Sequence, residues 1–398
     1  MLKYYLKPIL AACTFFPAIA AIVTMPFVIH NYRKYGGIAV MRVIVVYSFI
    51  LYCMCAFLLT VMPLPSMEAV AAMEPHPIGW IPYRDMAEGM AKAGMTFSDL
   101  STFRDEEIWK RFLDGGDLFQ MLANIVMMVP LGFYLRYYYR LSFRKVVIIS
   151  FCTSLFFEIT QLTGLYFLYP KPYRFTQMDD LIDNTLGGML GYALTPVIAL
   201  LLPSRDEIDR ISYLKGEHIT PVHSFFAEFL DISVCALLLG AVGFAFQAKG
   251  ALFLVLLCLG VVILFYFVFP CVTGGSTPGQ FILKVRTVSK DGTTLAAFWQ
   301  LIWRNFLLYG VELFFLLLCA SGLAGAAVLL LATNVSVWIR ILIMAVSLAV
   351  SVFSIIFSIR TRKRNDVPPH SYYSRTSEIP RGAEVRKKPR KQRRGAEG

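Results

Sequence analysis

The sequence predicts an all-α integral membrane protein, a polytopic bundle of about nine transmembrane helices. Of its 398 residues, 57% are hydrophobic and only 16% are charged, which is too apolar for an ordinary soluble domain. The apolar residues gather in stretches of roughly 20, the length that a helix needs to cross a bilayer. These two observations predict a multi-pass protein of a cell membrane.

The predicted spans follow one another along the chain. They cover residues 9–29, 43–62, 118–138, 146–168, 181–202, 226–246, 252–270, 306–331 and 337–359. Two interpretations of the first stretch stay open, a retained span or a cleavable signal peptide, because lysines precede it and small residues lie within it. We predict a retained span, since the stretch is long and the next one begins almost at once.

The distribution of Lys and Arg predicts the orientation of the spans. Cytoplasmic loops carry an excess of these residues, and here they concentrate in the gaps 30–42, 136–145, 203–224 and 271–304. We therefore predict an N-terminus outside and a C-terminus in the cytoplasm of a bacterial-type plasma membrane. The net acidic insertion 64–116 is then extracytoplasmic.

A short helix is predicted inside this insertion, with Thr102 as its N-cap and Gly115 and Gly116 as its end. Its large apolar side chains, which include Phe112, suit two placements. The helix either lies on the membrane surface or belongs to a solvated loop.

The net charge of +12 comes mostly from the C-terminal tail. From Arg360 onward there are thirteen Lys or Arg residues against four Asp or Glu residues. Because this block follows a span directly, we predict a disordered tail that contacts anionic lipid headgroups rather than nucleic acid.

Changes in composition predict five parts of the chain. They are an N-terminal transmembrane segment (1–40), a membrane domain with the insertion (41–203), a charged cytoplasmic linker (204–224), a second membrane domain (225–360) and a disordered basic tail (361–398). Residues 281–286 alternate in polarity before Asp291 and Gly292, which predicts a strand and a hairpin turn.

Polar residues inside the spans predict a functional site, because ionisable groups in hydrocarbon are costly. Glu158 and Gln161 are spaced i,i+3 and Asp180 and Asn184 are spaced i,i+4, so each pair lies on one helix face. Counting helical rise from the outer ends places Asn124, Glu158, Gln161 and Asn184 at similar depth in the outer half of the bilayer, with Arg174, Asp179 and Asp180 near the outer surface. The predicted ligand-binding set is Asn124, Glu158, Gln161, Arg174, Asp179, Asp180 and Asn184. The alternative is polar packing between helices, with Asp180 and Arg174 as an ion pair.

The sequence shows no pattern typical of metal binding, cofactor binding or catalysis by a histidine. The eight cysteines show no metal-ligand spacing, and the five histidines are scattered over loops and span ends. We therefore expect no metal, no cofactor and no histidine base. Gly187 and Gly191 form a Gly-x-x-x-Gly motif that predicts close helix packing.

The first membrane domain resembles the VanZ-like family, which is named after a teicoplanin-resistance accessory protein. The resemblance rests on Asn124 with Pro130-x-Gly132, Glu158-x-x-Gln161, Arg174, and the run from Asp179 to Gly191. It implies a role in the cell envelope and tolerance to glycopeptides. It names no ligand.

The second membrane domain resembles the RDD family, through Asp231, the run Thr277-Pro278-Gly279-Gln280, and Arg304. The resemblance implies a polar set of Asp231, Thr277, Gly279 and Arg304 that faces the cytoplasm, and an ion-exchange or transport role. Gln280 stands where lysine is usual, and Ser224 stands about where an arginine would precede the aspartate.

Three hypotheses of function follow. The first is binding or transport of an amphipathic envelope molecule, such as a lipid-linked precursor or a lipophilic antibiotic. In it, Arg174 contacts an anionic headgroup, the amides orient the ligand, and Glu158 is a partner whose charge depends on protonation. The second is an enzyme that uses Glu158 and Asp180 as an acid/base pair on a lipid-linked substrate. The third is a structural or regulatory partner of an envelope complex. The sequence leaves the ligand and the oligomeric state open.

Overall fold

Seven helices that are long and apolar enough to cross a membrane occur in the part of the chain that the structure describes. The computed structural model describes residues 2–74, 78–246, 250–290, 295–312 and 369–381. The prediction of an all-α polytopic membrane protein is confirmed. The last two predicted spans fall mostly on residues outside the described ones, so the number of nine stays a prediction.

The chain divides into two compact units, Met1–Met25 with Ala39–Ile211, and Pro26–Ile38 with Ser212–Gly398. The first unit contains the N-terminal part of α1 (Leu2–Tyr35) and the spans α2 (Val40–Val61), α6 (Asp117–Tyr137), α7 (Phe143–Leu162) and α9 (Met178–Ile198). A turn of 3-10 helix (Ala199–Leu201) follows α9, and α10 (Arg205–Lys215) forms part of the segment predicted as a linker.

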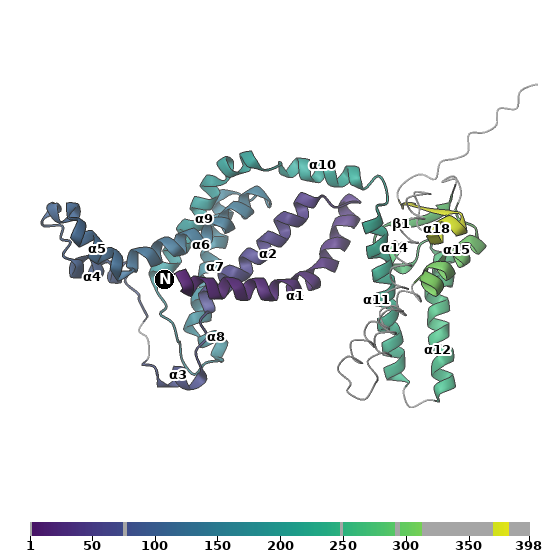
Figure 1. Cartoon of the computed structure of the whole chain (residues 1–398), viewed down its shortest axis with the longest axis horizontal. Helices are drawn as coiled ribbons and strands as arrows, with labels where there is room; N and C mark the ends of the chain where they lie inside the picture. The colour runs from purple at the N-terminus through teal and green to yellow at the C-terminus, as the bar shows by residue number, and fades with distance from the viewer. Residues whose placement is uncertain (1, 75–77, 247–249, 291–294, 313–368, 382–398) are drawn as a thin grey trace, which may run out of the picture. The chain divides into compact units, whose positions relative to one another are not determined.

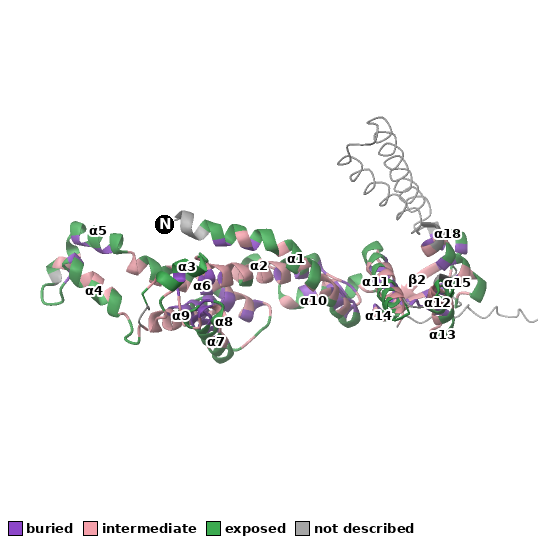
Figure 2. Cartoon of the chain, turned by 90° about the horizontal axis from the view of Figure 1, so that it is seen from below, coloured by how far each residue is buried: buried purple, intermediate pink, exposed green. Residues whose placement is uncertain are grey.

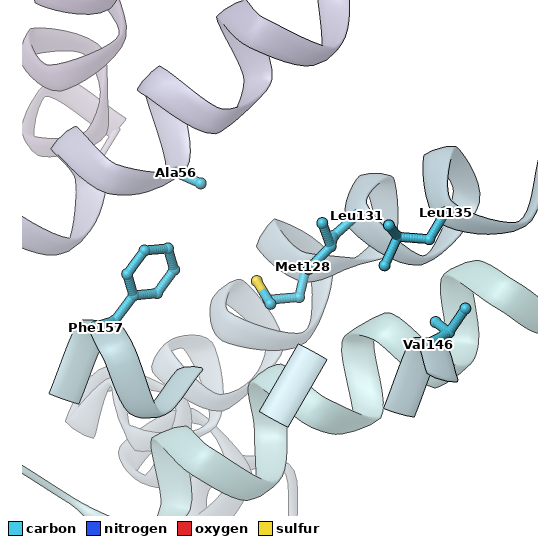
Figure 3. Packing of buried hydrophobic residues seen from close by; sticks show 6 residues of the cluster. All are labelled: Ala56, Met128, Leu131, Leu135, Val146 and Phe157. Atoms are coloured by element: carbon cyan, nitrogen blue, oxygen red, sulfur yellow. The ribbon is translucent and has the colours of Figure 1, made fainter. Parts of the chain in front are cut away.

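The core of the first unit lies where α2, α6 and α7 meet. Met128 of α6 is fully buried there, and Figure 3 shows its side chain pointing toward Ala56 of α2 and Phe157 of α7, members of the same buried cluster. Figure 2 shows the buried residues gathered among α6, α7 and α9, whereas α1 is mostly exposed. Exposed apolar side chains on a span suit contact with lipid.

Helices α6 and α9 pack backbone against backbone, as the Gly-x-x-x-Gly motif predicts. A Cβ atom added to Gly187 would lie 2.2 Å from the carbonyl oxygen of Ile125, and one added to Gly191 would lie 2.0 Å from that of Val129. Side chains at these positions would push the two helices apart. The glycines therefore hold α9 against α6.

Helix α7 ends earlier than the sequence predicts. It stops at Leu162, and the predicted span ran to residue 168. Gly164, Leu165 and Tyr166 adopt positive φ angles of 58°, 58° and 55°, which a continuing helix does not allow. Glu158 consequently lies about one turn from the end of its helix, nearer that end than predicted.

The insertion folds into α3 (Met67–Ala72), α4 (Arg84–Ala93), a 3-10 turn (Leu100–Arg104) and α5 (Glu106–Gly115). The predicted cap at Thr102 is wrong, because the carboxylate of Asp105 accepts the first free backbone N–H groups of α5, from Glu107 and Ile108. Ile108 and Phe112 are buried against Ala93 at the end of α4. Part of the apolar face of this helix is thus covered by protein, while Trp109 and Leu113 stay exposed.

The second unit contains the spans α11 (Pro221–Ala245) and α12 (Ala251–Ile263), the latter continued by a π-helical turn (Leu264–Val268) and α13 (Phe269–Val272). After α13 come α14 (Pro278–Ile282), β1 (Val285–Ser289), α15 (Phe298–Asn305) and a π-helical turn (Phe306–Glu312). The segment predicted as a disordered tail supplies α18 (Pro369–Ser374) and β2 (Thr376–Pro380). Figure 1 labels α11, α12, α14, β1, α15 and α18, and Figure 2 labels α13 and β2.

The two strands correct two predictions. The strand in this region begins at Val285, after a helix, and pairs antiparallel with β2, opposite Glu378 at position Thr287. The expected hairpin turn at 291–292 lies outside the described residues. The prediction of a disordered tail is wrong for residues 369–380, because the backbone groups of β2 find their partners on β1. The basic cluster after residue 381 lies outside the described residues.

Candidate functional site

A cavity of about 850 Å³ opens among the helices of the first unit. Its walls come from α1, α2, α6, α7, α9 and the loop before α9, and its volume is typical of small-molecule sites. Most of the lining is apolar, for example Leu59, Leu122, Val126 and Phe157. Six of the seven predicted ligand-binding residues line it, namely Asn124, Glu158, Gln161, Arg174, Asp180 and Asn184.

Asp180 is held at the cavity by hydrogen bonds from two neighbouring helices. The side-chain amide of Asn124 on α6 donates to its carboxylate across 2.5 Å, and the Ser154 hydroxyl on α7 donates to its backbone carbonyl across 3.0 Å. Asn184 donates its amide N–H to the same Ser154 oxygen at 2.9 Å. Because the Ser154 proton is already used, this bond fixes which end of the Asn184 amide is the nitrogen.

Two amide oxygens at this cavity have no hydrogen-bond partner among the described residues. Gln161 donates its Nε2 to the carbonyl of Thr60 at 3.0 Å, which leaves its Oε1 unpaired. The Oδ1 of Asn184 is unpaired as well. The two residues are only 6% and 3% exposed, so bulk water does not reach them freely. Buried acceptors without partners are uncommon and call for a donor.

Glu158 lies beside this group, 4% exposed, and faces the same cavity as Asp180. Its carboxylate accepts the backbone N–H of Gln177 at 3.2 Å, at the start of α9. The two carboxyl groups are close enough for each to affect the ionisation of the other.

Arg174 lines the cavity, but its hydrogen-bond partners are backbone groups that the sequence does not reveal. Its Nη1 donates to the carbonyl oxygens of Leu59, Thr60 and Met62 at 3.1, 2.5 and 3.3 Å. These carbonyls form the C-terminal end of α2, where unpaired acceptors and the helix dipole attract a cation. Arg174 therefore caps α2, and it has no ion pair with Asp180 within 4.0 Å among the described residues.

Asp179, the seventh predicted residue, turns away from the large cavity. It accepts the backbone N–H of Tyr83 at 2.7 Å, and the Tyr83 hydroxyl donates to Asp183 at 2.9 Å. Burial, followed by the hydrogen bond and charge of Asp183, raises the pKa of Tyr83 to about 12. At neutral pH this tyrosine is thus a protonated donor that ties the insertion to α9.

A small acidic pocket of about 60 Å³ adjoins the large cavity, since Gln120 and Asp180 line both. Five aspartates line it, which are Asp85, Asp117, Asp179, Asp180 and Asp183. A groove of about 390 Å³ continues outward from it and shares Asp85, Gln177 and Asp179. Trp80, Ile81 and Phe175, all exposed, line this groove.

Sequence reasoning missed Ser154, Tyr83 and Asp183. Ser154 stands one turn before Glu158 on the same helix face, so the i,i+4 spacing was a usable signal. Tyr83 lies 100 residues before Asp183, and no local pattern connects the two.

The predicted polar set of the second unit is partly brought together. Asp231 on α11 is fully buried and accepts from the Thr277 hydroxyl at 2.5 Å, the Gly279 N–H at 2.6 Å and the Tyr309 hydroxyl at 2.8 Å. Thr277 also caps α14, with Gln280 completing a capping box. Asp231 thus fastens the start of α14 to α11.

Arg304 instead pairs with Glu378 of β2, a residue that sequence reasoning missed. The Glu378 carboxylate also accepts from Ser224 at 2.5 Å and from Gln280 at 2.9 Å. Burial acts to raise the pKa of Glu378, but the positive charge of Arg304, the hydrogen bond from Ser224 and the nearby histidines together outweigh it and hold the pKa below its usual range. Ser224 and Gln280, the two residues that depart from the RDD pattern, therefore both donate hydrogen bonds to the Glu378 carboxylate.

Across the part of the chain that the structure describes, no group of three or more His, Cys, Asp or Glu residues has the geometry of a metal site. This holds for the acidic pocket as well.

The fold and the large cavity define a polytopic α-helical membrane protein with a polar site inside its helix bundle. The VanZ/LLP1 family model matches residues 49–201, and the RDD family model matches residues 224–368. The chain therefore carries a VanZ-like domain followed by an RDD family domain, which confirms both resemblances. Glu378 lies beyond the matched RDD segment. A search of curated proteins found no significant match, and a search of solved structures found none either.

Proposed function

We propose that the first unit binds an amphipathic molecule of the cell envelope, such as a lipid-linked precursor or a lipophilic antibiotic, in the large cavity. The observation that carries the proposal is the convergence of six polar residues from three spans and a loop on one mostly apolar chamber. An amphipathic ligand matches this chamber, because its chain would contact the apolar walls and its polar end the buried amides and carboxyls.

Binding or transport is favoured over a purely structural role. Polar residues that served only helix packing would satisfy one another, whereas Gln161 and Asn184 each keep an unpaired oxygen at the cavity. Burying an unpaired acceptor costs about 1–3 kcal/mol, which a ligand donor would recover. A bacterial-type plasma membrane and glycopeptide tolerance belong to the same proposal, on the strength of the VanZ-like domain.

The test is to fill the cavity without touching its polar residues. Ala123→Phe on α6 places a ring in the chamber, and Ala193→Phe on the exposed face of α9 is the matched control. We expect the first variant to lose labelling by a diazirine-bearing fatty alcohol, and cells that carry it to lose teicoplanin tolerance. The control should keep both. Equal behaviour of the two variants at normal expression would contradict the proposal.

The orientation of the cavity toward the outside is part of this proposal. It rests on the positive-inside rule, and the structure offers two exposed positions to test it. In a chain without native cysteines, Lys92→Cys on α4 should react with an impermeant maleimide in intact cells, and Glu217→Cys after α10 should not. The reverse pattern would overturn the orientation.

A second candidate is an acid/base enzyme on a lipid-linked substrate. It is favoured by one observation, that Glu158 and Asp180 face the same cavity. Turnover of a radiolabelled lipid-linked precursor by the purified protein would establish this function. Stoichiometric binding without product would exclude it for that substrate.

A further inference from the structure

We propose that the polar end of the ligand is a cationic hydrogen-bond donor, such as a primary ammonium group, and not an anionic headgroup. This inference rests on the proposed function of the cavity and names the chemistry of its ligand. It reverses the expectation that Arg174 binds an anion.

The hydrogen-bonding capacity of the cavity is the first argument. The two unpaired atoms at its polar end, Oε1 of Gln161 and Oδ1 of Asn184, are both acceptors. Their orientation is settled, since each amide nitrogen already donates, to the carbonyl of Thr60 and to the hydroxyl of Ser154. A ligand must therefore bring N–H or O–H groups, which a fully ionised phosphate lacks.

The balance of charge is the second argument. Glu158 and Asp180 line the cavity against a single cation, Arg174. One nitrogen of that guanidinium is committed to three carbonyls at the end of α2. Neither carboxylate has a Lys or Arg partner within 4.0 Å among the described residues. A cation placed between these two carboxyl groups would stabilise both as carboxylates, whereas an anion there would oppose their ionisation.

The pocket and groove that adjoin the cavity also carry more negative than positive side chains, which is the third argument. The adjoining acidic pocket adds Asp85, Asp117, Asp179 and Asp183, and none of the described residues that line it is Lys or Arg. Their described partners are neutral donors, such as the Gln177 amide on Asp85. Beyond it, the groove has three carboxyl groups, Asp85, Glu88 and Asp179, and one cation, Arg84, which pairs with Glu88. Exposed Trp80, Ile81 and Phe175 in the same groove suit the headgroup region of a bilayer. A row of carboxylates leading into an apolar chamber attracts cations and rejects anions.

The experiment compares three photoreactive probes that share one dodecyl chain with a diazirine and differ only in the headgroup, which is a primary amine, an alcohol or a phosphate monoester. The full-length protein is placed in phosphatidylcholine nanodiscs, and labelled peptides are identified by mass spectrometry. Labelling of cavity peptides is divided by labelling of the exposed α12 peptide around Leu252, which corrects for partitioning of each probe into the bilayer.

We expect corrected labelling of the cavity by the amine to exceed labelling by the phosphate by about tenfold or more, the effect of one charge-assisted hydrogen bond. Alcohol labelling should fall between the two. In the Glu158→Gln/Asp180→Asn double variant the amine and the alcohol should label equally, while the Ala193→Phe control keeps the preference.

Any other labelling result would overturn either the cationic headgroup or the amphiphile site. A phosphate that labels as well as the amine, or an alcohol that equals the amine in the unaltered protein, refutes the cationic headgroup and leaves the amphiphile site standing. Cavity labelling no higher than at Leu252 for all three probes refutes the amphiphile site itself. If the double variant fails to fold, the comparison of the three probes on the unaltered protein still tests the cationic headgroup.

Discussion

Asn124 on α6 donates a hydrogen bond of 2.5 Å to the carboxylate of Asp180 on α9. This bond joins the two helices that pack through Gly187 and Gly191, and it holds the carboxylate toward the cavity. Because the donor is a neutral amide, the bond positions Asp180 without neutralising its charge. Asp180 could therefore serve helix packing through this bond, ligand binding at the cavity, or both.

Replacing each of the two carboxyl side chains by the corresponding amide should preserve the fold and remove the function. In Asp180→Asn the new amide oxygen still accepts from Asn124, and in Glu158→Gln it still accepts from the Gln177 N–H. We expect the free energy of unfolding to change by less than about 1 kcal/mol, since a buried charge is also removed. Amine-probe labelling should fall by about tenfold. Thermal unfolding in detergent and probe labelling measure the two effects; normal labelling in both variants would show that these carboxyls serve packing.

Arg174→Gln should destabilise the first unit, because it removes the cap from the end of α2. Hydrogen bonds from a charged donor contribute about 1.5–3 kcal/mol, and we expect a loss in this range. The Arg174→Gln/Asp180→Asn double variant should show the sum of the single effects. Recovery of stability in the double variant would instead indicate that Arg174 and Asp180 act as an ion pair.

Gly191→Ala should weaken the packing of α6 against α9. The added methyl group would meet the Val129 carbonyl oxygen, so the helices must separate, at a cost of about 1–3 kcal/mol. Gly240→Ala on α11 is the matched control, because a Cβ atom there meets no described atom within 4 Å. Thermal unfolding should show a lower midpoint for Gly191→Ala only. Similar midpoints would mean that the two helices tolerate a wider spacing.

Glu378→Gln should destabilise the second unit, because it leaves the buried guanidinium of Arg304 without a counter-ion. Breaking a buried ion pair from one side costs about 3–5 kcal/mol. Ser377→Ala, one residue earlier on β2, should have a small effect. The pKa of Glu378 is lowered in the folded protein, so its contribution is present at neutral pH and is lost as the pH falls through that lowered pKa. Unfolding midpoints of the two proteins should therefore converge in acid; a constant difference would contradict the ion pair.

Six of the seven polar residues in the predicted set line the cavity, and the sequence could bring them together because helix geometry is local. The spacing of Glu158 with Gln161, and of Asp180 with Asn184, determines which face of a helix each residue occupies. Apolar length likewise determines the spans, and the seven in the described residues agree with the first seven predicted.

Contacts between distant segments account for what the sequence did not reveal. The sequence suggested an anionic headgroup or, in the alternative, Asp180 as the partner of Arg174, but its described partners are carbonyls of α2 that lie up to 115 residues away. Glu378 stands 74 residues after Arg304 in a stretch whose composition suggests disorder, and it is held by strand pairing with β1 and by its contact with Arg304. Backbone acceptors and strand partners of this kind leave no pattern in side-chain chemistry.

A density map of the protein in lipid nanodiscs, determined by single-particle electron microscopy with the dodecyl amine probe present, tests the central claim most directly. We predict elongated density in the cavity, with its chain along Leu122 and Val126 and its polar end within hydrogen-bonding distance of Gln161 and Asn184. A map that resolves lipid chains on the outer faces of the spans while this cavity holds only water or is closed by side chains would contradict the account.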